Sequence, residues 1–295
     1  MTALADWMQQ CGLDRRDAQV LVAAALGLSR AQQMAHPEHP LETTDLARLN
    51  VLASRVRAGE PVAYVLGEKE FFGLTFQVGP DVLIPRPDTE LLVECALHRL
   101  DALPTADSPR SVLDLGTGSG AIAVAIAHAR AAVQVWAVDV SEAALAVAQA
   151  NARRLLDPQR AGGPIHFVQS DWFAALQNCE PASRFDCIVA NPPYVAQGDP
   201  HLAALRYEPA LALTGQHPSP TGLDDLRRIA AQAGAFLRAG GWLLLEHGWD
   251  QAAAVGALLT AQGWEAVSSV NDLAGIARVT AARWPQKVPH APKIG

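Results

Sequence analysis

The stretch Asp114-Leu115-Gly116-Thr117-Gly118-Ser119-Gly120 follows a short apolar run and precedes an alanine-rich segment. This order predicts a buried strand, then a glycine-rich turn, then a helix. Glycine lets the backbone turn tightly and approach a ligand closely. The spacing G-x-G-x-G differs from the G-x-G-x-x-G fingerprint of dinucleotide enzymes, and glycine-rich turns between strands and helices are common. The turn alone is therefore only a weak indication of a small-molecule site.

From Ser111 onward, segments typical of strands alternate with segments typical of helices. Such alternation predicts an α/β fold with a mostly parallel sheet covered on both faces. The expected strands are Val112–Leu115, Val133–Val138, Ile165–Val168, Phe185–Val189, Trp242–Glu246, Ala266–Val270 and Ala277–Ala281. The expected helices are Ala121–Ala129, Glu142–Leu156, Leu223–Leu237 and Gln251–Ala261.

Polar residues follow the second and third of these strands. Asp139 ends the strand VWAVDV, where a carboxylate can accept both hydroxyl groups of a ribose. After the third strand, Asp171 can accept a hydrogen bond from the exocyclic amine of adenine, and Trp172 offers an apolar face to its ring. Each residue also has a purely structural interpretation, with Asp139 capping the helix that begins at Glu142 and Trp172 in the core.

Asn191-Pro192-Pro193-Tyr194 lies just beyond the carboxyl end of the fourth strand. Two prolines cannot continue a central strand, since neither has an N–H to donate, and each holds the preceding residue in an extended conformation. The result is a stiff corner that presents the Asn191 amide and the carbonyl groups of Asn191 and Pro192. Such a corner suits a planar group bearing an NH₂. A turn that only closes a strand is the alternative, but ligand-binding residues at three preceding strand ends favour a site.

The remaining segments predict a modular chain. Residues 1–63 have the pattern of a small all-helical domain, and residues 64–87, rich in aromatics around Gly73, predict a β-hairpin linker that acts as a hinge. The α/β domain is expected to cover residues 88–284, followed by a loose tail at 285–295. Residues 195–222 form a loop long enough to be functional, and we expect it to fold over the substrate.

Composition excludes several classes of protein. A net charge of −7 disfavours a protein that grips bare nucleic acid through many phosphates. The four cysteines are scattered without metal-ligand spacing, so we expect no metal site. No apolar run reaches the roughly 18 residues of a membrane span, and no secretory signal is apparent. We therefore expect a cytoplasmic protein with no membrane attachment and no direct nucleic-acid partner.

With these motifs the chain resembles class I S-adenosylmethionine-dependent methyltransferases, and more narrowly the bacterial release-factor glutamine methyltransferases of the PrmC/HemK family. The Asn-Pro-Pro-Tyr motif is shared with adenine-N6 DNA methyltransferases, whereas a helical module joined to Pro85–Glu90 is more specific. Related enzymes that methylate a ribosomal protein tend to differ at the Pro-Arg segment. The resemblance covers nearly the whole chain and includes Glu60–Gly67, Glu70–Leu74, Pro85–Glu90, Asp114–Gly120, Ser170–Phe173, Asn191–Val195, Glu208-Pro209, Leu244–Gly248 and Asp272–Gly275.

The resemblance implies a Rossmann-like class I methyltransferase with a seven-stranded sheet, preceded by a helical domain that docks the release factor. It implies transfer of a methyl group from S-adenosyl-L-methionine to the side-chain nitrogen N5 of the glutamine in the GGQ motif of peptide chain release factors, by a monomer. The cofactor-binding residues it implies are Gly116, Thr117, Gly118, Ser119, Gly120, Asp139, Asp171, Trp172 and Asn191. The substrate-binding residues are Asn191, Pro192, Pro193 and Tyr194, and of these Asn191, Pro192 and Tyr194 are the catalytic ones.

Other functions stay open at this point. A nucleic-acid amino methyltransferase acting on adenine N6 or guanine N2 would flip a base against Tyr194, and it should carry a basic face or an added recognition segment. The ribosomal-protein glutamine methyltransferase and a non-catalytic cofactor-binding module are further alternatives. His247 invites an acid/base role, but a structural role is favoured because amide methylation needs no histidine.

Overall fold

The computed structural model describes residues 2–103, 109–178 and 184–286. The chain divides into two compact units, residues 1–68 with 78–80 and residues 69–77 with 81–295. Residues 287–295 of the predicted tail and Cys179 lie outside the described residues. Within the described ranges, no helix combines the length and the apolar character needed to cross a bilayer.

The first unit is built from five helices that share one apolar core containing Trp7, Leu21 and Leu49. The helices are α1 (Leu4–Gln10), α2 (Arg15–Leu26), α3 (Arg30–Ala35), α4 (Thr43–Arg57) and α5 (Val62–Leu66). Two short strands, β1 (Thr2–Ala3) and β2 (Pro40–Leu41), also pair antiparallel, so the unit is not purely helical as predicted. Helix α5 begins after Pro61 and ends at Gly67, which has the left-handed conformation of a helix terminus, so it spans the boundary that we predicted at residue 63.

The predicted hairpin is present, but its aromatic side chains are buried, whereas those of a mobile linker would be exposed. Strands β3 (Glu68–Phe71) and β4 (Leu74–Gln77) form a two-stranded sheet. Phe71 and Phe76 are buried in the core of the second unit. The side chain of Asn151 accepts a hydrogen bond from the Gln77 N–H at 2.7 Å and donates one to the Gln77 carbonyl at 3.0 Å. The hairpin from Lys69 onward is therefore an integral part of the α/β unit.

The second unit contains the predicted seven-stranded, mostly parallel sheet. Its strands are β5 (Ser111–Leu115), β6 (Gln134–Asp139), β7 (His166–Gln169), β8 (Phe185–Ala190), β9 (Leu237–Glu246), β10 (Glu265–Asn271) and β11 (Ala277–Arg283). The order across the sheet is β10-β11-β9-β8-β5-β6-β7. Strands β5 to β9 run parallel to one another, whereas β11 is antiparallel to both of its neighbours.

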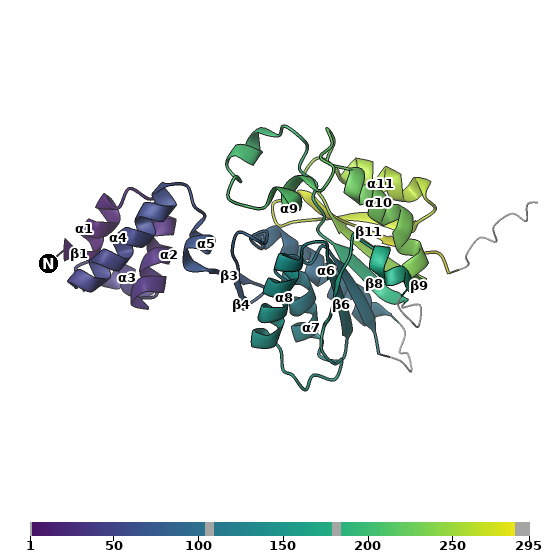
Figure 1. Ribbon diagram of the computed structural model, residues 1–295, viewed down its shortest axis with the longest axis horizontal. Helices are drawn as coiled ribbons and strands as arrows, with labels where there is room; N and C mark the ends of the chain where they lie inside the picture. Colours follow the sequence, from purple (N-terminus) through teal and green to yellow (C-terminus); the bar gives the residue numbers. More distant parts are fainter. Residues whose placement is uncertain (1, 104–108, 179–183, 287–295) are drawn as a thin grey trace, which may run out of the picture. The chain divides into compact units, whose positions relative to one another are not determined.

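Helices cover both faces of this sheet (Figure 1). One face packs against α6 (Glu90–Ala102), α7 (Ala121–Ala129) and α8 (Glu142–Leu155), and the other against α10 (Asp224–Ala233) and α11 (Ala252–Ala261). The alternation of side chains along β8 shows the division, since Cys187 and Val189 enter the first core and Ile188 and Ala190 enter the second. A strand with two buried faces reads as a continuous apolar run, as β8 does.

One predicted helix is shorter than expected. We predicted a helix over Leu223–Leu237, but α10 ends at Ala233, a 3₁₀ turn follows, and β9 begins at Leu237. The pairing of β8 with β9 shifts register between Phe185 and Cys187, so the residues of β9 between Leu237 and Trp242 bulge out of the ladder. Gly240 has φ +80° within this bulge, a conformation that favours glycine.

The topology determines where a ligand can bind. From β5 the chain passes through α7 to β6 on one side, and β8 pairs with β5 on the other side. The strand order thus reverses between β5 and β8, and a crevice forms outside their carboxyl ends. The glycine-rich turn follows β5, and Asn191 follows β8, so both stand at this crevice.

Candidate active site

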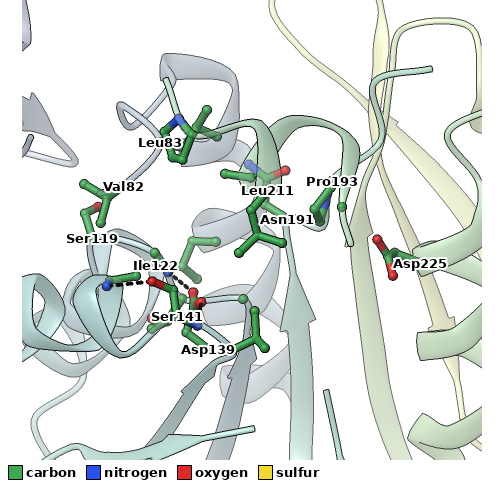
Figure 2. A pocket seen from close by; sticks show the side chains of 18 of the residues that line it. Val82, Leu83, Ser119, Ile122, Asp139, Ser141, Asn191, Pro193, Leu211 and Asp225 are labelled. Atoms are coloured by element: carbon green, nitrogen blue, oxygen red, sulfur yellow. Dashed lines mark hydrogen bonds between the residues drawn. The ribbon is translucent and has the colours of Figure 1, made fainter. Parts of the chain in front are cut away.

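A cavity lies at the carboxyl ends of β5, β6, β7 and β8. Figure 2 shows Asp139 and Ser141 together on one side of it and Asn191 with Pro193 on the other. The glycine turn and the acceptor corner therefore face one shared space, close enough for one small molecule to touch both. The predicted site residues that line it are Gly116, Thr117, Gly118, Ser119, Asp139, Asp171, Trp172, Asn191 and Pro193.

The three glycines of the turn serve different purposes, although all have positive φ values. A Cβ atom on Gly116 would lie 3.4 Å from the Trp172 ring, whereas a Cβ on Gly118 would meet no atom within 4 Å. A Cβ on Gly120 would lie 3.2 Å from the Cα of Ala148 in α8. Gly120 therefore permits close packing of α8 rather than lining the cavity, and Gly118 leaves the space open for a ligand.

A buried carboxyl group braces the turn from beneath. Asp114 is fully buried and accepts hydrogen bonds from the Thr117 hydroxyl at 2.6 Å and from the Ala123 N–H at 3.2 Å. Burial raises the pKa of Asp114 to about 7, because a charged carboxylate loses its hydration there. Asp114 thus fixes the turn and the first turn of α7 together.

Asp139 has its carboxylate held in place by the backbone. Its Oδ2 accepts from the Gly118 N–H at 2.8 Å, and its Oδ1 accepts from the Ser141 N–H at 2.9 Å. Helix α8 is capped by Ser141 rather than by Asp139, since the Ser141 hydroxyl accepts from the Ala144 N–H. Burial raises the pKa of Asp139. The Val140 N–H also hydrogen bonds this carboxylate. A carboxylate offers about four acceptor sites, so Asp139 has room for a further donor such as a hydroxyl group.

The segment after β7 is held by two residues at the start of α10. Arg228 donates to Asp171 Oδ2 at 2.8 Å, and the Trp172 indole N–H donates to Asp225 Oδ1 at 3.2 Å. Trp172 has φ +50°, a left-handed conformation that is uncommon for a bulky residue. The strained backbone and the fixed indole N–H hold the six-membered ring of Trp172 beside Gly116. Strain of this kind is concentrated at functional sites.

The four residues of the corner do not all face the cavity. Asn191 and Pro193 line it, whereas Pro192 and Tyr194 are not among its lining residues. The Asn191 Nδ2 atom donates to the Thr89 hydroxyl at 3.2 Å. The Tyr194 ring packs against the core on the α10 side. Burial raises the pKa of Tyr194 above its usual range.

Behind the corner lies a second buried carboxyl group, Glu246 at the end of β9. Tyr194 donates to Glu246 Oε1 at 3.4 Å, and the Thr89 hydroxyl also hydrogen bonds this carboxyl group. Burial raises the pKa of Glu246 to about 7, against smaller effects of these hydrogen bonds and of Arg278 that lower it. His247, the next residue, uses its ring nitrogens within the fold, on the Thr280 hydroxyl and the Gly248 carbonyl, each at 2.9 Å.

The long segment after the corner contributes to the lining of the cavity, and its folding over a substrate stays a prediction. The Val195 N–H donates to the Leu213 carbonyl at 3.0 Å, and Leu211 lines the cavity. Glu208 is buried and accepts from Arg86 at 2.5 Å and from the Ile84 N–H at 3.1 Å. The segment therefore closes one side of the cavity and is clamped to the residues that precede α6.

Sequence reasoning missed several residues that hold the site together. Glu208, Arg86 and Thr89 belong to motifs that we had singled out without giving these residues a role. Asp225 and Arg228 carry no motif, and only their place in the amino-terminal half of a helix at the sheet's carboxyl edge marks them.

Comparison with known proteins gives a consistent picture. A model of the PrmC N-terminal domain matches residues 6–67, and a model of the methyltransferase small domain matches residues 89–207. A release factor glutamine methyltransferase of Burkholderia pseudomallei is 53% identical over 95% of this chain and 96% of its own length. The proteins of the same name from Bordetella pertussis and Pseudomonas aeruginosa are 49% and 46% identical, over 95% and 92% of this chain and 98% and 92% of theirs.

Solved structures share the fold at low sequence identity. A methyltransferase from Pyrococcus furiosus aligns with a TM-score of 0.50 and 18% identity, over 80% of this chain and 98% of that chain. A T. thermophilus 16S rRNA N2 methyltransferase, in complex with AdoMet and guanosine, aligns with a TM-score of 0.51 and 24% identity, over 73% of this chain and 49% of that one. These similarities support the class I methyltransferase fold and no more.

Proposed function

Because this chain belongs to the release-factor glutamine methyltransferase family, we propose that it transfers a methyl group from S-adenosyl-L-methionine to the side-chain nitrogen N5 of the glutamine in the GGQ motif of peptide chain release factors. One observation carries the proposal from the structure. The glycine turn with Asp139 and the corner with Asn191 line the same cavity. A methyl donor held by the first can therefore meet an amide held by the second.

The residues present fit S-adenosyl-L-methionine. Asp139 would bind the ribose hydroxyls, Trp172 would lie against the adenine, and Asp171 Oδ1 would accept from the adenine amine while Oδ2 pairs with Arg228. The open space at Gly118 and the backbone of residues 116–120 would accommodate the methionine part. When bound, the cofactor supplies a methyl group on positively charged sulfur, which is strongly electrophilic.

The corner would orient the substrate amide. An amide nitrogen is a poor nucleophile, because its lone pair is shared with the carbonyl group. In the proposed arrangement, Asn191 Oδ1 accepts one N–H bond of the glutamine. The Pro192 carbonyl would accept the other, although Pro192 is not among the residues that line the cavity in this structure. These contacts fix the direction of the nitrogen and stabilise the positive charge that develops on it. Pro193 lines the slot, and the proton can leave after transfer without a strong base.

Tyr194 remains part of this proposal, but with a different role from the one that we expected. We expected its ring to stack on the substrate amide. Since the ring packs against the core instead of lining the cavity, Tyr194 would shape the slot from behind the corner. Stacking on the amide would require the ring to turn when the substrate binds.

Further parts of the proposal concern partners and compartment. The amino-terminal helical unit would dock the release factor, and the enzyme would act as a monomer in the cytoplasm, without direct contact to nucleic acid. A nucleic-acid amino methyltransferase is the second candidate, because the Asn-Pro-Pro-Tyr corner suits any planar NH₂. The net charge of −7 and the identity to release factor glutamine methyltransferases support the first candidate over the second.

The test is an incubation with labelled S-adenosyl-L-methionine and either a purified release factor or DNA. The proposal expects a gain of about 14 mass units, one CH₂, on the glutamine of the release factor by mass spectrometry. Asn191→Ala should lower turnover far more than cofactor affinity, whereas Asn271→Ala, at an exposed position of β10, serves as the matched control. Methylation of DNA and not of the release factor would refute the proposal.

A further inference from the structure

A single buried carboxyl group connects the two side chains of the acceptor corner that carry hydrogen-bonding groups. Glu246 is 2% exposed, and its Oε1 accepts from the Tyr194 hydroxyl at 3.4 Å. Its Oε2 has no hydrogen-bond partner in the part of the chain that the structure describes. The Thr89 hydroxyl also hydrogen bonds this carboxyl group and lowers its pKa. Thr89 in turn contacts Asn191 Nδ2 at 3.2 Å. A chain of hydrogen bonds therefore runs from Asn191 through Thr89 to Glu246.

The chemistry of these groups gives the chain a direction. An ionised carboxylate only accepts hydrogen bonds, and a hydroxyl group has a single hydrogen to donate. With Glu246 ionised, the Thr89 hydrogen points to Glu246, and Thr89 Oγ1 is left to accept from Asn191. Asn191 must then turn its NH₂ toward Thr89, which directs its Oδ1 toward the cavity that it lines.

We propose that Glu246 and Thr89 are positioning residues that determine which end of the Asn191 amide faces the substrate. This inference rests on the proposed methylation of a glutamine amide, in which only Oδ1 of Asn191 can accept the substrate N–H. Hydrogen bonds in a chain also polarise one another, so an ionised Glu246 places more negative charge on Asn191 Oδ1. With Glu246 protonated, its proton can go to Thr89 and the hydrogen of Thr89 to Asn191, which turns the Asn191 NH₂ toward the substrate NH₂.

Glu246 should change its ionisation state within a pH range in which the methylation rate can be measured. Burial raises its pKa to about 7, the negative charge of Asp88 raises it further, and Arg278 and Tyr194 lower it. Arg278 itself pairs with Asp88 at 3.1 Å, and the adjacent His247 turns its ring nitrogens to other partners. Acidification below about pH 7 should therefore increase the protonated form and reduce the correctly oriented Asn191.

The first test compares two substitutions of one buried residue. Thr89→Val keeps the shape of the side chain and removes the hydroxyl, whereas Thr89→Ser keeps the hydroxyl. Steady-state methylation of a purified release factor should show kcat roughly tenfold lower for Thr89→Val than for Thr89→Ser, the effect of about one hydrogen bond. The cofactor dissociation constant should stay similar in both. Thr260→Val, exposed on α11, should not change kcat.

The second test is the pH profile of kcat. In the wild type, kcat should fall as the pH drops through about 7. In Glu246→Gln, whose side chain cannot ionise, kcat should be lower than in the wild type and should not show this fall at acidic pH. Equal kcat values for the two Thr89 variants, or an acid limb that persists in Glu246→Gln, would overturn the inference while leaving the proposed function intact. A wild type that methylates no glutamine would overturn the proposed function and the inference with it.

Discussion

Replacing Glu208 by alanine should loosen the segment that closes the cavity. The carboxylate is 2% exposed and accepts from two donors, the Arg86 guanidinium at 2.5 Å and the Ile84 N–H at 3.1 Å. Alanine leaves the buried Ile84 N–H without a partner, which costs about 1–3 kcal/mol. Arg86 is 35% exposed and can turn to water, so loss of the ion pair adds only about 1 kcal/mol. We expect a loss of roughly 3 kcal/mol in the free energy of unfolding, or about 6–12 °C in Tm.

The control for this prediction is an ion pair of similar geometry at the surface. Asp101 accepts two hydrogen bonds from Arg130, at 3.0 and 2.6 Å, but the two side chains are 54% and 42% exposed. Asp101 also lies at the carboxyl end of α6, where a negative charge is unfavourable. Asp101→Ala should therefore lose less than about 1 kcal/mol.

Two measurements test the role of the contacts that Glu208 makes with Ile84 and Arg86. Urea unfolding gives the free energies of both variants, and calorimetric titration with S-adenosyl-L-homocysteine gives their affinities for the cofactor product. Glu208→Ala should bind more weakly, because Pro209 and Leu211 line the cavity and follow the clamp directly. Equal losses of stability in Glu208→Ala and Asp101→Ala would show that burial of the Glu208 carboxylate does not have the consequence we assign to it.

Three further predictions concern the site. Asp139→Ala should weaken S-adenosyl-L-methionine binding by about tenfold through lost hydrogen bonds, and an unchanged dissociation constant in a titration would remove the ribose assignment. Gly222→Ala should cost roughly 2–4 kcal/mol in urea unfolding, because its Cβ would lie 2.1 Å from the Tyr194 carbonyl oxygen at φ +64°; wild-type stability would contradict this contact. Burial raises the pKa of Asp114 to about 7, so between about pH 4 and 7 the folded state holds a proton that the unfolded state has released, and wild-type stability falls as the pH rises. The stability of Asp114→Asn relative to wild type should therefore increase across this window and level off above it, and a constant difference would indicate that Asp114 is ionised in the folded protein throughout.

The sheet and the residues at its strand ends could be predicted because their signals are local. Each strand is a short apolar run, and in a parallel sheet the carboxyl ends of neighbouring strands meet at one edge. Asp139, Trp172 and Asn191 were therefore expected near one another although they are distant in sequence, and all three line one cavity. The expectation that these three residues lie together required no knowledge of side-chain contacts.

The supporting contacts could not be predicted, because they join residues with no pattern in common. Asn191 and Thr89 are 102 residues apart, and Trp172 and Asp225 are 53 apart. The hairpin shows the same limit, since local sequence predicted its strands but not the burial of Phe76 in the α/β core. Such pairings depend on how helices pack on the finished sheet, which periodicity does not describe.

The position of β11 has a consequence for biosynthesis. Among the strands that the structure describes, β11 comes last in sequence, yet it inserts between β9 and β10, which are both made earlier. Until Ala277–Arg283 has left the ribosome, one edge of β9 is open, and β10 has no partner through which to join the sheet. Unpaired edges attract other chains, so a nascent or truncated protein that stops near Asn271 should depend on chaperones. The sheet can therefore be completed only after β11 has been translated.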